Sequence, residues 1–161
     1  MTRILFVCLG NIIRSPLAAR LFERMAKEAG VADKYVADAA GTADYHVGQT
    51  PDERMVRTAA RRGFHYSHRG RQVTPKDLDD YDLIVPMDLE NLQDLHTLAG
   101  NREYKKKTHL LREFDPEADG AVAVPDPWYG GSRGFEEVYD IIERSVRGLL
   151  QSLEAGEVEL P

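Results

Sequence analysis

Short apolar runs alternate with longer amphipathic stretches along this chain. The short runs predict buried strands at residues 4–7, 35–39, 81–85 and 107–111. Apolar residues spaced three and four apart predict helices that begin at Pro16, at Thr50-Pro51 and after Asp88, with a last helix over residues 135–153. This alternation favours a doubly wound α/β fold, a four-stranded parallel sheet with helices on both faces.

Composition narrows the class of protein. The chain has 161 residues, 42% of them apolar, which predicts a single domain over residues 1–161. A formal charge of −6 argues against a nucleic-acid-binding or anionic-lipid-binding surface. The apolar run at residues 4–9 is too short for a signal peptide, and no stretch is long enough to insert in a membrane.

The chain contains one cysteine, Cys8. One cysteine forms neither an internal disulfide nor a cysteine-rich zinc site, and no other metal-ligand pattern is present. We therefore expect no metal and a reducing, cytoplasmic location. The oligomeric state stays open at this stage.

The segment CLGNIIRSP, residues 8–16, connects the first predicted strand to the first predicted helix. Ligands bind at this edge of open α/β sheets, and the free N–H groups of a helix start favour an anion. Gly10 permits a tight turn, and Asn11 tolerates left-handed backbone geometry. Arg14 can bind two phosphate oxygens at once, so the segment predicts a phosphate-binding loop.

The same surroundings act on Cys8, because a thiol near an arginine and a helix start ionises readily. A thiolate beneath a bound phosphoryl group is an in-line nucleophile, which accepts the phosphate before water removes it. A lone cysteine after a strand can also be a small core residue, and Ser15 can be only a helix cap. The combination of strand, Cys8, Arg14, Ser15 and Pro16 favours the catalytic interpretation.

The motif V-C-L-G-N-I-x-R-S-P at residues 7–16 resembles the phosphate-binding signature of the low-molecular-weight protein tyrosine phosphatases, and the likeness extends through most of the chain. The resemblance implies that Cys8 is the nucleophile, that Arg14 binds phosphate and that Ser15 supports the thiolate as a leaving group. It also implies that Asn11 holds the loop in its strained shape. The loop is completed by Leu9, Gly10, Ile12 and Ile13.

The resemblance also implies a general acid, because a phenolate leaving group, whose conjugate acid has a pKa near 10, departs poorly without a proton. The family carries this acid in an Asp-Pro-aromatic loop. The matching segment here is V-P-D-P-W-Y-G-G, so Asp126 is expected to act as acid and then as base. Taken alone, Asp-Pro would indicate only a turn.

Aromatic residues are expected to line the cleft and to exclude shorter phosphoserine. Trp128 and Tyr129 follow the predicted acid directly, and Tyr45 matches an aromatic on the opposite wall in the family. Any one of them alone could be a core anchor. Their occurrence in two matching loops favours a binding slot.

The chain departs from the family at several positions. Many members carry a second cysteine where this chain has Ile13, a glutamate at Ala19 and a serine at Ala39. His68 matches a family histidine that joins a network with those polar groups. It is therefore either a support of the loop or a half-buried structural residue.

Four other functions can be compared with this prediction. An arsenate reductase of this fold needs further cysteines, and a protein-arginine phosphatase resembles the loop with threonine in place of Ile12. A phosphotyrosine-binding module or a structural protein would not need Cys8, Arg14, Ser15 and Asp126 together. We therefore predict a tyrosine phosphatase that uses no cofactor and acts on phosphotyrosine-containing proteins.

Overall fold

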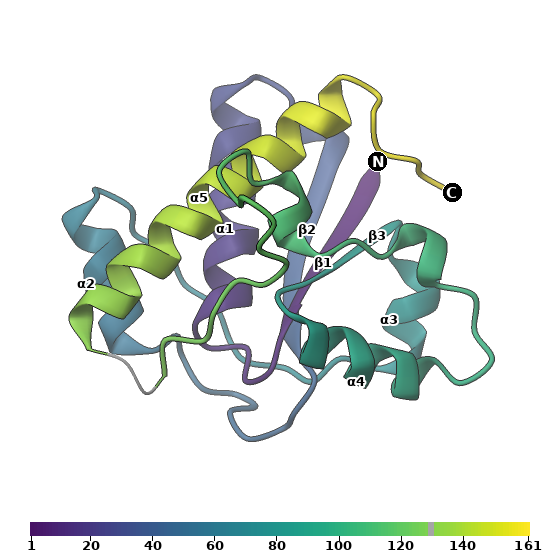
Figure 1. Ribbon diagram of the computed structural model, residues 1–161, viewed down its shortest axis with the longest axis horizontal. Helices are drawn as coiled ribbons and strands as arrows, with labels where there is room; N and C mark the ends of the chain where they lie inside the picture. Colours follow the sequence, from purple (N-terminus) through teal and green to yellow (C-terminus); the bar gives the residue numbers. More distant parts are fainter. Residues whose placement is uncertain (129–130) are drawn as a thin grey trace.

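The computed structural model describes residues 1–128 and 131–161, and a parallel sheet lies at its centre (Figure 1). The strands are β1 (Thr2–Cys8), β2 (Tyr35–Gly41) and β3 (Leu83–Pro86), in the order β2-β1-β3. Cys8 pairs with Gly41 and Val7 pairs with Pro86. The segments that follow the three strands therefore begin next to one another at one edge of the sheet.

Helices cover both faces of this sheet, as the sequence predicted. The helices are α1 (Arg14–Glu28), α2 (Glu53–Arg61), α3 (Pro75–Asp80), α4 (Leu89–Ala99) and α5 (Ser132–Glu154), and the short 3₁₀ helices are η1 (Ala32–Lys34), η2 (Lys105–Lys107) and η3 (Leu111–Phe114). Helices α1, α2 and α5 lie on one side of the strands, and α3 and α4 lie on the other (Figure 1).

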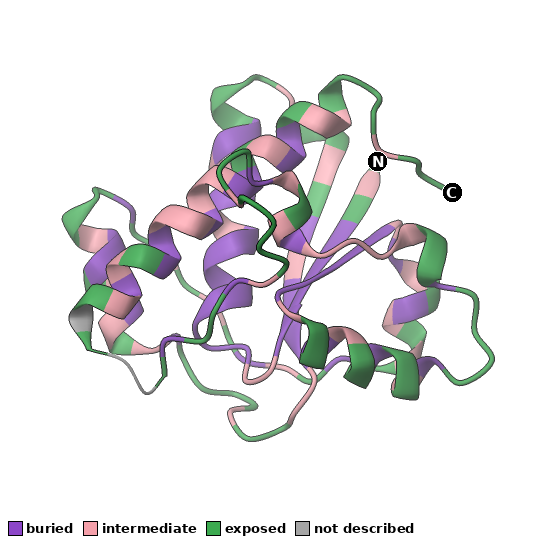
Figure 2. Cartoon of the chain, viewed as in Figure 1, coloured by how far each residue is buried: buried purple, intermediate pink, exposed green. Residues whose placement is uncertain are grey.

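Alternation along β1 builds the two cores. Ile4, Phe6 and Cys8 face the larger core with α1 and α5, whereas Leu5 and Val7 face the smaller core with α3 and α4. Figure 2 shows the buried residues concentrated on the strands and on the facing helix surfaces. Because β1 is buried on both faces, the loop that follows it starts from a rigid position.

The predicted fourth strand at residues 107–111 is wrong, and the sheet has three strands. This segment makes a single parallel bridge, between Ile84 and Thr108, and His109 N donates to Ile84 O over 3.0 Å. On either side the chain turns into η2 and η3, which use the neighbouring amides for local hydrogen bonds. The ladder therefore ends after one bridge.

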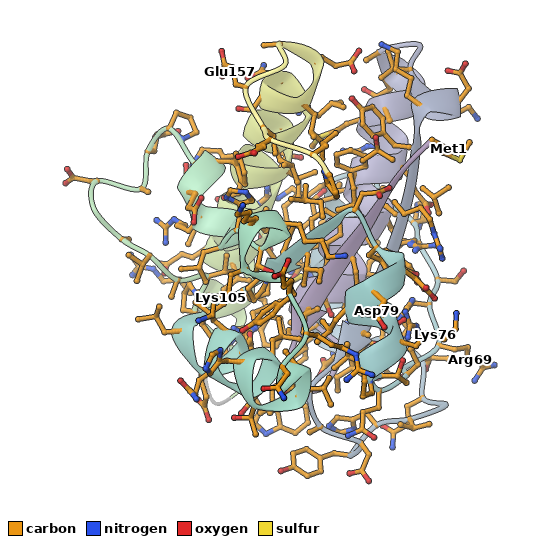
Figure 3. The ribbon with its side chains drawn as sticks, turned by 90° about the vertical axis from the view of Figure 1, so that its right-hand side faces the viewer. Met1, Arg69, Lys76, Asp79, Lys105 and Glu157 are labelled. Carbon is orange, nitrogen blue, oxygen red and sulfur yellow. The ribbon has the colours of Figure 1, made fainter. Side chains whose placement is uncertain are left out.

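The helices also differ from the sequence prediction. The second helix begins at Glu53 with Asp52 as its cap, so Thr50 and Pro51 precede it. Helix α3 is absent from the sequence prediction, although Thr74 and Asp77 form a capping box at its start. It buries Leu78 and turns Lys76 and Asp79 to the surface, which Figure 3 shows from the side of α3 and α4.

Within the described residues, no helix combines the length and apolar character that crossing a bilayer requires.

Candidate active site

The loop between β1 and α1 is hydrogen-bonded to the segment that follows β2. Three of its carbonyl oxygens accept backbone hydrogen bonds, to Cys8 from Thr42 (2.9 Å), to Leu9 from Ala43 (3.0 Å) and to Ile12 from Asp52 (2.9 Å). Within the described part of the chain, the loop amides of Leu9, Gly10, Ile12 and Ile13 have no internal acceptor. Free amides at the start of a helix form a suitable site for an anion.

Asn11 holds the centre of the loop. Its φ angle is +59°, in the left-handed region that asparagine tolerates better than most residues. The side-chain Nδ2 donates to Ser15 Oγ over 2.9 Å, and Oδ1 accepts from the amide of Arg71 over 2.9 Å. His68 Nε2 lies 2.8 Å from the same Oδ1. Since Oδ1 is an acceptor, His68 carries its proton on Nε2.

The sulfur of Cys8 has two hydrogen-bonding neighbours, although the residue is almost completely buried. Asn11 N donates to Sγ over 3.3 Å, and Ser15 Oγ lies 2.9 Å from Sγ. Because Ser15 Oγ already accepts a hydrogen bond from Asn11 Nδ2, its own hydrogen is available to the sulfur. These two contacts fix the position of the sulfur beside the loop.

Arg14 lies at the first turn of α1 and is buried beside the loop. Its Nη1 donates to Asp88 Oδ2 over 2.7 Å and to Val124 O over 2.9 Å, and its Nη2 lies 3.5 Å from Asp126 Oδ2. Burial alone would lower the pKa of this guanidinium, but the negative charges of Cys8, Asp88 and Asp126 outweigh burial and raise it. The hydrogen bonds to Asp88 and to the carbonyl of Val124 hold the cation in one orientation.

Asp88 is a site residue that sequence reasoning identified only as a helix cap. It does cap α4, since Oδ1 accepts from Asn91 N over 2.7 Å, while Oδ2 binds Arg14. Its position shortly after β3 was the available signal, because the loop after β1 lies at the same edge of the sheet.

His68 lies behind the loop, among charged side chains. Burial lowers the pKa of its imidazole, the cations of Arg20 and Arg71 lower it further, and Asp38 opposes them in part. The ring is therefore neutral at pH 7. Ala19 and Ala39 are fully buried and provide no polar group to the histidine.

A pocket of about 340 Å³ opens above the loop. It brings together most of the residues that the sequence identified, and its lining is Cys8, Leu9, Gly10, Asn11, Ile12, Ile13, Arg14, Tyr45, His46, Asp126 and Trp128. Ser15 and His68 lie outside this lining, and both contact the side chain of Asn11 in the loop. Tyr129 lies outside the described residues. A larger hollow of about 550 Å³, between residues 96–107 and 159–161, contains none of the predicted site residues.

Aromatic rings form the rim of the pocket. The side chains of Tyr45 and Trp128 are exposed at its mouth, and His46 lies between them, with ring centroids 6.4 Å from Tyr45 and 5.7 Å from Trp128. His46 was missed by the sequence analysis, although it directly follows Tyr45. Its Nδ1 is 2.8 Å from Gln49 Oε1, which fixes the ring plane.

A sequence model of one family, described as low molecular weight phosphotyrosine protein phosphatase, matches residues 3–159. The chain belongs to this family. The tyrosine phosphatase YfkJ of Bacillus subtilis, a named member, is 40% identical over 156 residues, which cover 96% of this chain and 97% of that protein.

Solved phosphatase structures share the fold. A protein tyrosine phosphatase from Entamoeba histolytica superimposes with a TM-score of 0.91 at 36% identity, covering 98% of this chain and 99% of that one. A Drosophila arginine phosphatase superimposes with a TM-score of 0.86 at 29% identity, covering 96% and 98%. The family relationship therefore extends over the whole described fold, and the identity of the substrate depends on the site.

Proposed function

We propose that this protein hydrolyses phosphotyrosine in proteins through a phosphocysteine intermediate on Cys8, with Asp126 as general acid and then as general base. The observation that carries the proposal is one pocket of about 340 Å³ lined by Cys8, Arg14 and Asp126. A nucleophile, a fixed cation and a carboxyl group in one small pocket are the components that a metal-independent phosphoryl transfer needs.

In the first step the Cys8 thiolate attacks phosphorus. A sulfur–phosphorus bond forms while the bond from phosphorus to the tyrosine oxygen breaks, and Asp126 transfers its proton to the departing phenolate oxygen. Arg14 and the loop amides of Leu9, Gly10, Ile12 and Ile13 bind the phosphate oxygens. These donors are in place before the reaction begins.

In the second step water attacks the phosphocysteine. Asp126, now a carboxylate, accepts a proton from this water, the sulfur–phosphorus bond breaks, and inorganic phosphate leaves. Cys8 departs as a thiolate. The hydrogen bonds from Asn11 N and Ser15 Oγ to its sulfur favour that departure.

The walls of the pocket support an aromatic substrate. Tyr45 and Trp128 flank the opening and offer apolar faces to a phenyl ring. Ile12, which stands where a protein-arginine phosphatase has threonine, brings no hydroxyl group to the loop. Both features favour phosphotyrosine over phosphoarginine.

The test measures phosphate release from three peptides, which carry phosphotyrosine, phosphoserine or phosphoarginine, with and without a chelator. We expect rapid release from phosphotyrosine alone, and the same rate with the chelator. Cys8→Ser serves as the control, because the serine hydroxyl does not ionise near neutral pH. This variant should still bind inorganic phosphate but should not hydrolyse any of the peptides. Faster release from phosphoarginine would overturn the substrate assignment, and activity in Cys8→Ser would overturn the mechanism.

A further inference from the structure

The segment at the start of α2 connects the loop of Cys8 with the loop of Asp126. Asp52 N donates to Ile12 O over 2.9 Å, which fastens this segment to the nucleophile loop. The Asp52 carboxylate also caps α2, because Oδ1 accepts from Arg54 N over 2.9 Å. Asp52 is thus held at a fixed distance from the loop.

Arg54 binds Asp52 through a two-pronged ion pair. Its Nε donates to Oδ1 over 3.1 Å, and its Nη2 donates to Oδ2 over 2.9 Å. The hydrogen bonds with Asp52 raise the pKa of Arg54, burial opposes them in part, and the charges of Asp52 and Asp126 raise the pKa further. The guanidinium plane is therefore fixed, which leaves Nη1 for another partner.

That partner is the loop of the proposed acid. Arg54 Nη1 donates to Trp128 O over 3.1 Å, and the guanidinium carbon lies 5.1 Å from the Trp128 ring centroid and 4.7 Å from that of Phe135. In turn, Trp128 N donates to Asp126 Oδ1 over 3.0 Å. A chain of two hydrogen bonds therefore links Arg54 to the carboxyl group of Asp126 through Trp128.

The backbone of the acid loop has limited contact with the rest of the described chain. Among the residues that the structure describes, Arg54 makes the one hydrogen bond that reaches the backbone of residues 125–128 from elsewhere in the chain. The carboxylate of Asp126 also has a longer ion pair with Arg14, at 3.5 Å, and the Trp128 ring lies beside His46, with ring centroids 5.7 Å apart. A dianionic substrate competes for Arg14, so that ion pair weakens when phosphate binds.

We propose that Arg54 is a positioning residue for the general acid, an inference that rests on the role proposed above for Asp126. Through Asp52 it ties the acid loop to the nucleophile loop, and it keeps Asp126 near the leaving oxygen when substrate occupies Arg14. Arginine suits this position because a planar guanidinium binds a carboxylate and a carbonyl in fixed directions while its face lies over aromatic rings.

The test compares Arg54→Met with Arg57→Met as a matched control. Arg57 lies on the same helix and is exposed, and its ion pair within the described residues is a long one with Glu53, at 3.8 Å. Each variant is assayed with phenyl phosphate, whose leaving group needs a proton, and with 2,4-dinitrophenyl phosphate, whose leaving group does not. The inhibition constant of inorganic phosphate reports the nucleophile loop independently.

For Arg54→Met we expect kcat/KM for phenyl phosphate to fall about 10- to 100-fold, as for a misplaced catalytic group. For 2,4-dinitrophenyl phosphate it should fall less than about threefold. Inhibition by phosphate should stay unchanged, and Arg57→Met should behave like the unmodified protein. Equal losses on both substrates together with weaker phosphate binding would mean that Arg54 supports the fold generally, and this would overturn the proposal.

A double variant separates this proposal from the function on which it rests. In the Asp126→Ala background, Arg54→Met should cause no further loss, because both changes remove the same proton transfer. Full activity of Asp126→Ala would overturn the acid assignment itself. A slowed Asp126→Ala beside an unchanged Arg54→Met would overturn only the role of Arg54.

Arg54→Lys provides a second variant if methionine at this position lowers the unfolding temperature. Lysine keeps the charge and the apolar stem but lacks the planar group that joins Asp52 to Trp128. We expect the same selective loss on phenyl phosphate, of smaller size. Equal kcat/KM ratios for the two substrates in Arg54→Lys and in the unmodified protein would contradict the proposal.

Discussion

At the scale of single residues, the proposed chemistry depends most directly on Cys8. Its sulfur has a donor in Asn11 N and a hydroxyl neighbour in Ser15. Ile13 occupies the position where many family members carry a second cysteine, and it is buried at the N-cap of α1. The proposed nucleophile therefore has no thiol partner within the chain, since the chain has one cysteine.

Peroxide treatment should consequently inactivate the protein in a way that later reduction does not fully reverse. A thiolate is oxidised first to sulfenic acid, and without a second thiol it proceeds to sulfinic and sulfonic acids. In Ile13→Cys a disulfide can trap the sulfenic acid, and activity should return with dithiothreitol, provided that the two sulfurs reach bonding geometry. Mass spectrometry of the Cys8 peptide and an activity assay measure both outcomes.

Full recovery of the unmodified protein, with no overoxidised Cys8 peptide, would contradict this prediction. An Ile13→Ala variant is the matched control, because it removes the same side chain without adding a thiol. It should be inactivated irreversibly, like the unmodified protein.

Asp126 is the second residue whose role a single substitution tests. Asp126→Ala should slow phosphotyrosine hydrolysis about 10²- to 10⁴-fold, the usual contribution of a general acid. The loss should be smaller for aryl phosphates with acidic leaving groups, because these depart without a proton. Unchanged kcat/KM for a phosphotyrosine peptide would contradict the assignment.

At the scale of helices, α5 and η3 approach each other closely. Gly148 makes it possible, because a Cβ atom at this position would lie only 1.9 Å from Phe114 O. The absence of a side chain lets the helix and the turn approach each other. The turn in question includes η3, which replaces part of the predicted fourth strand.

Gly148→Ala should therefore destabilise the protein by about 1–3 kcal/mol, the usual cost of overpacking. This holds although alanine is favoured over glycine inside a helix by about 1 kcal/mol. Gly134→Ala, near the start of the same helix, is the control, because a Cβ atom there would make an ordinary contact at 3.8 Å with Pro127 Cβ. Urea unfolding measures both variants, and equal stability of the two would refute the packing argument.

The stability of the whole molecule should depend on pH through His68. Unfolding exposes this histidine to water, where its pKa returns to the ordinary value of 6.5, whereas in the folded protein burial and nearby cations hold the pKa lower. The unfolded state thus binds more protons between the two values. The stabilising contribution is complete above pH 6.5 and is lost as the pH falls through the lower folded value.

Acidification from pH 7.5 to pH 5.5 should consequently lower the unfolding free energy of the unmodified protein more than that of His68→Gln. His65→Gln, which replaces an exposed histidine nearby, should keep the full pH dependence. Chemical denaturation at the two pH values provides the comparison. The same slope in His68→Gln and in the unmodified protein would show that other groups cause the acid sensitivity.

The sequence alone determined the features that depend on neighbours along the chain. The three strands and the four longer helices follow from apolar spacing, since a buried face requires that spacing wherever the element lies. The proximity of Cys8, Asn11, Arg14 and Ser15 was predictable because they lie within eight residues, between a strand and a helix. Local geometry brings such residues together in any parallel sheet.

Only the tertiary structure decided the contacts between distant segments. Arg14 meets Asp88, and Arg54 meets Trp128, each across 74 residues, and no spacing in the sequence encodes either pair. The sequence also did not indicate that the predicted fourth strand is absent. The chain forms 3₁₀ helices at residues 105–107 and 111–114, and a single bridge remains between them. These outcomes depend on the order β2-β1-β3, because that order determines which carboxyl ends, and hence which side chains, share one edge of the sheet.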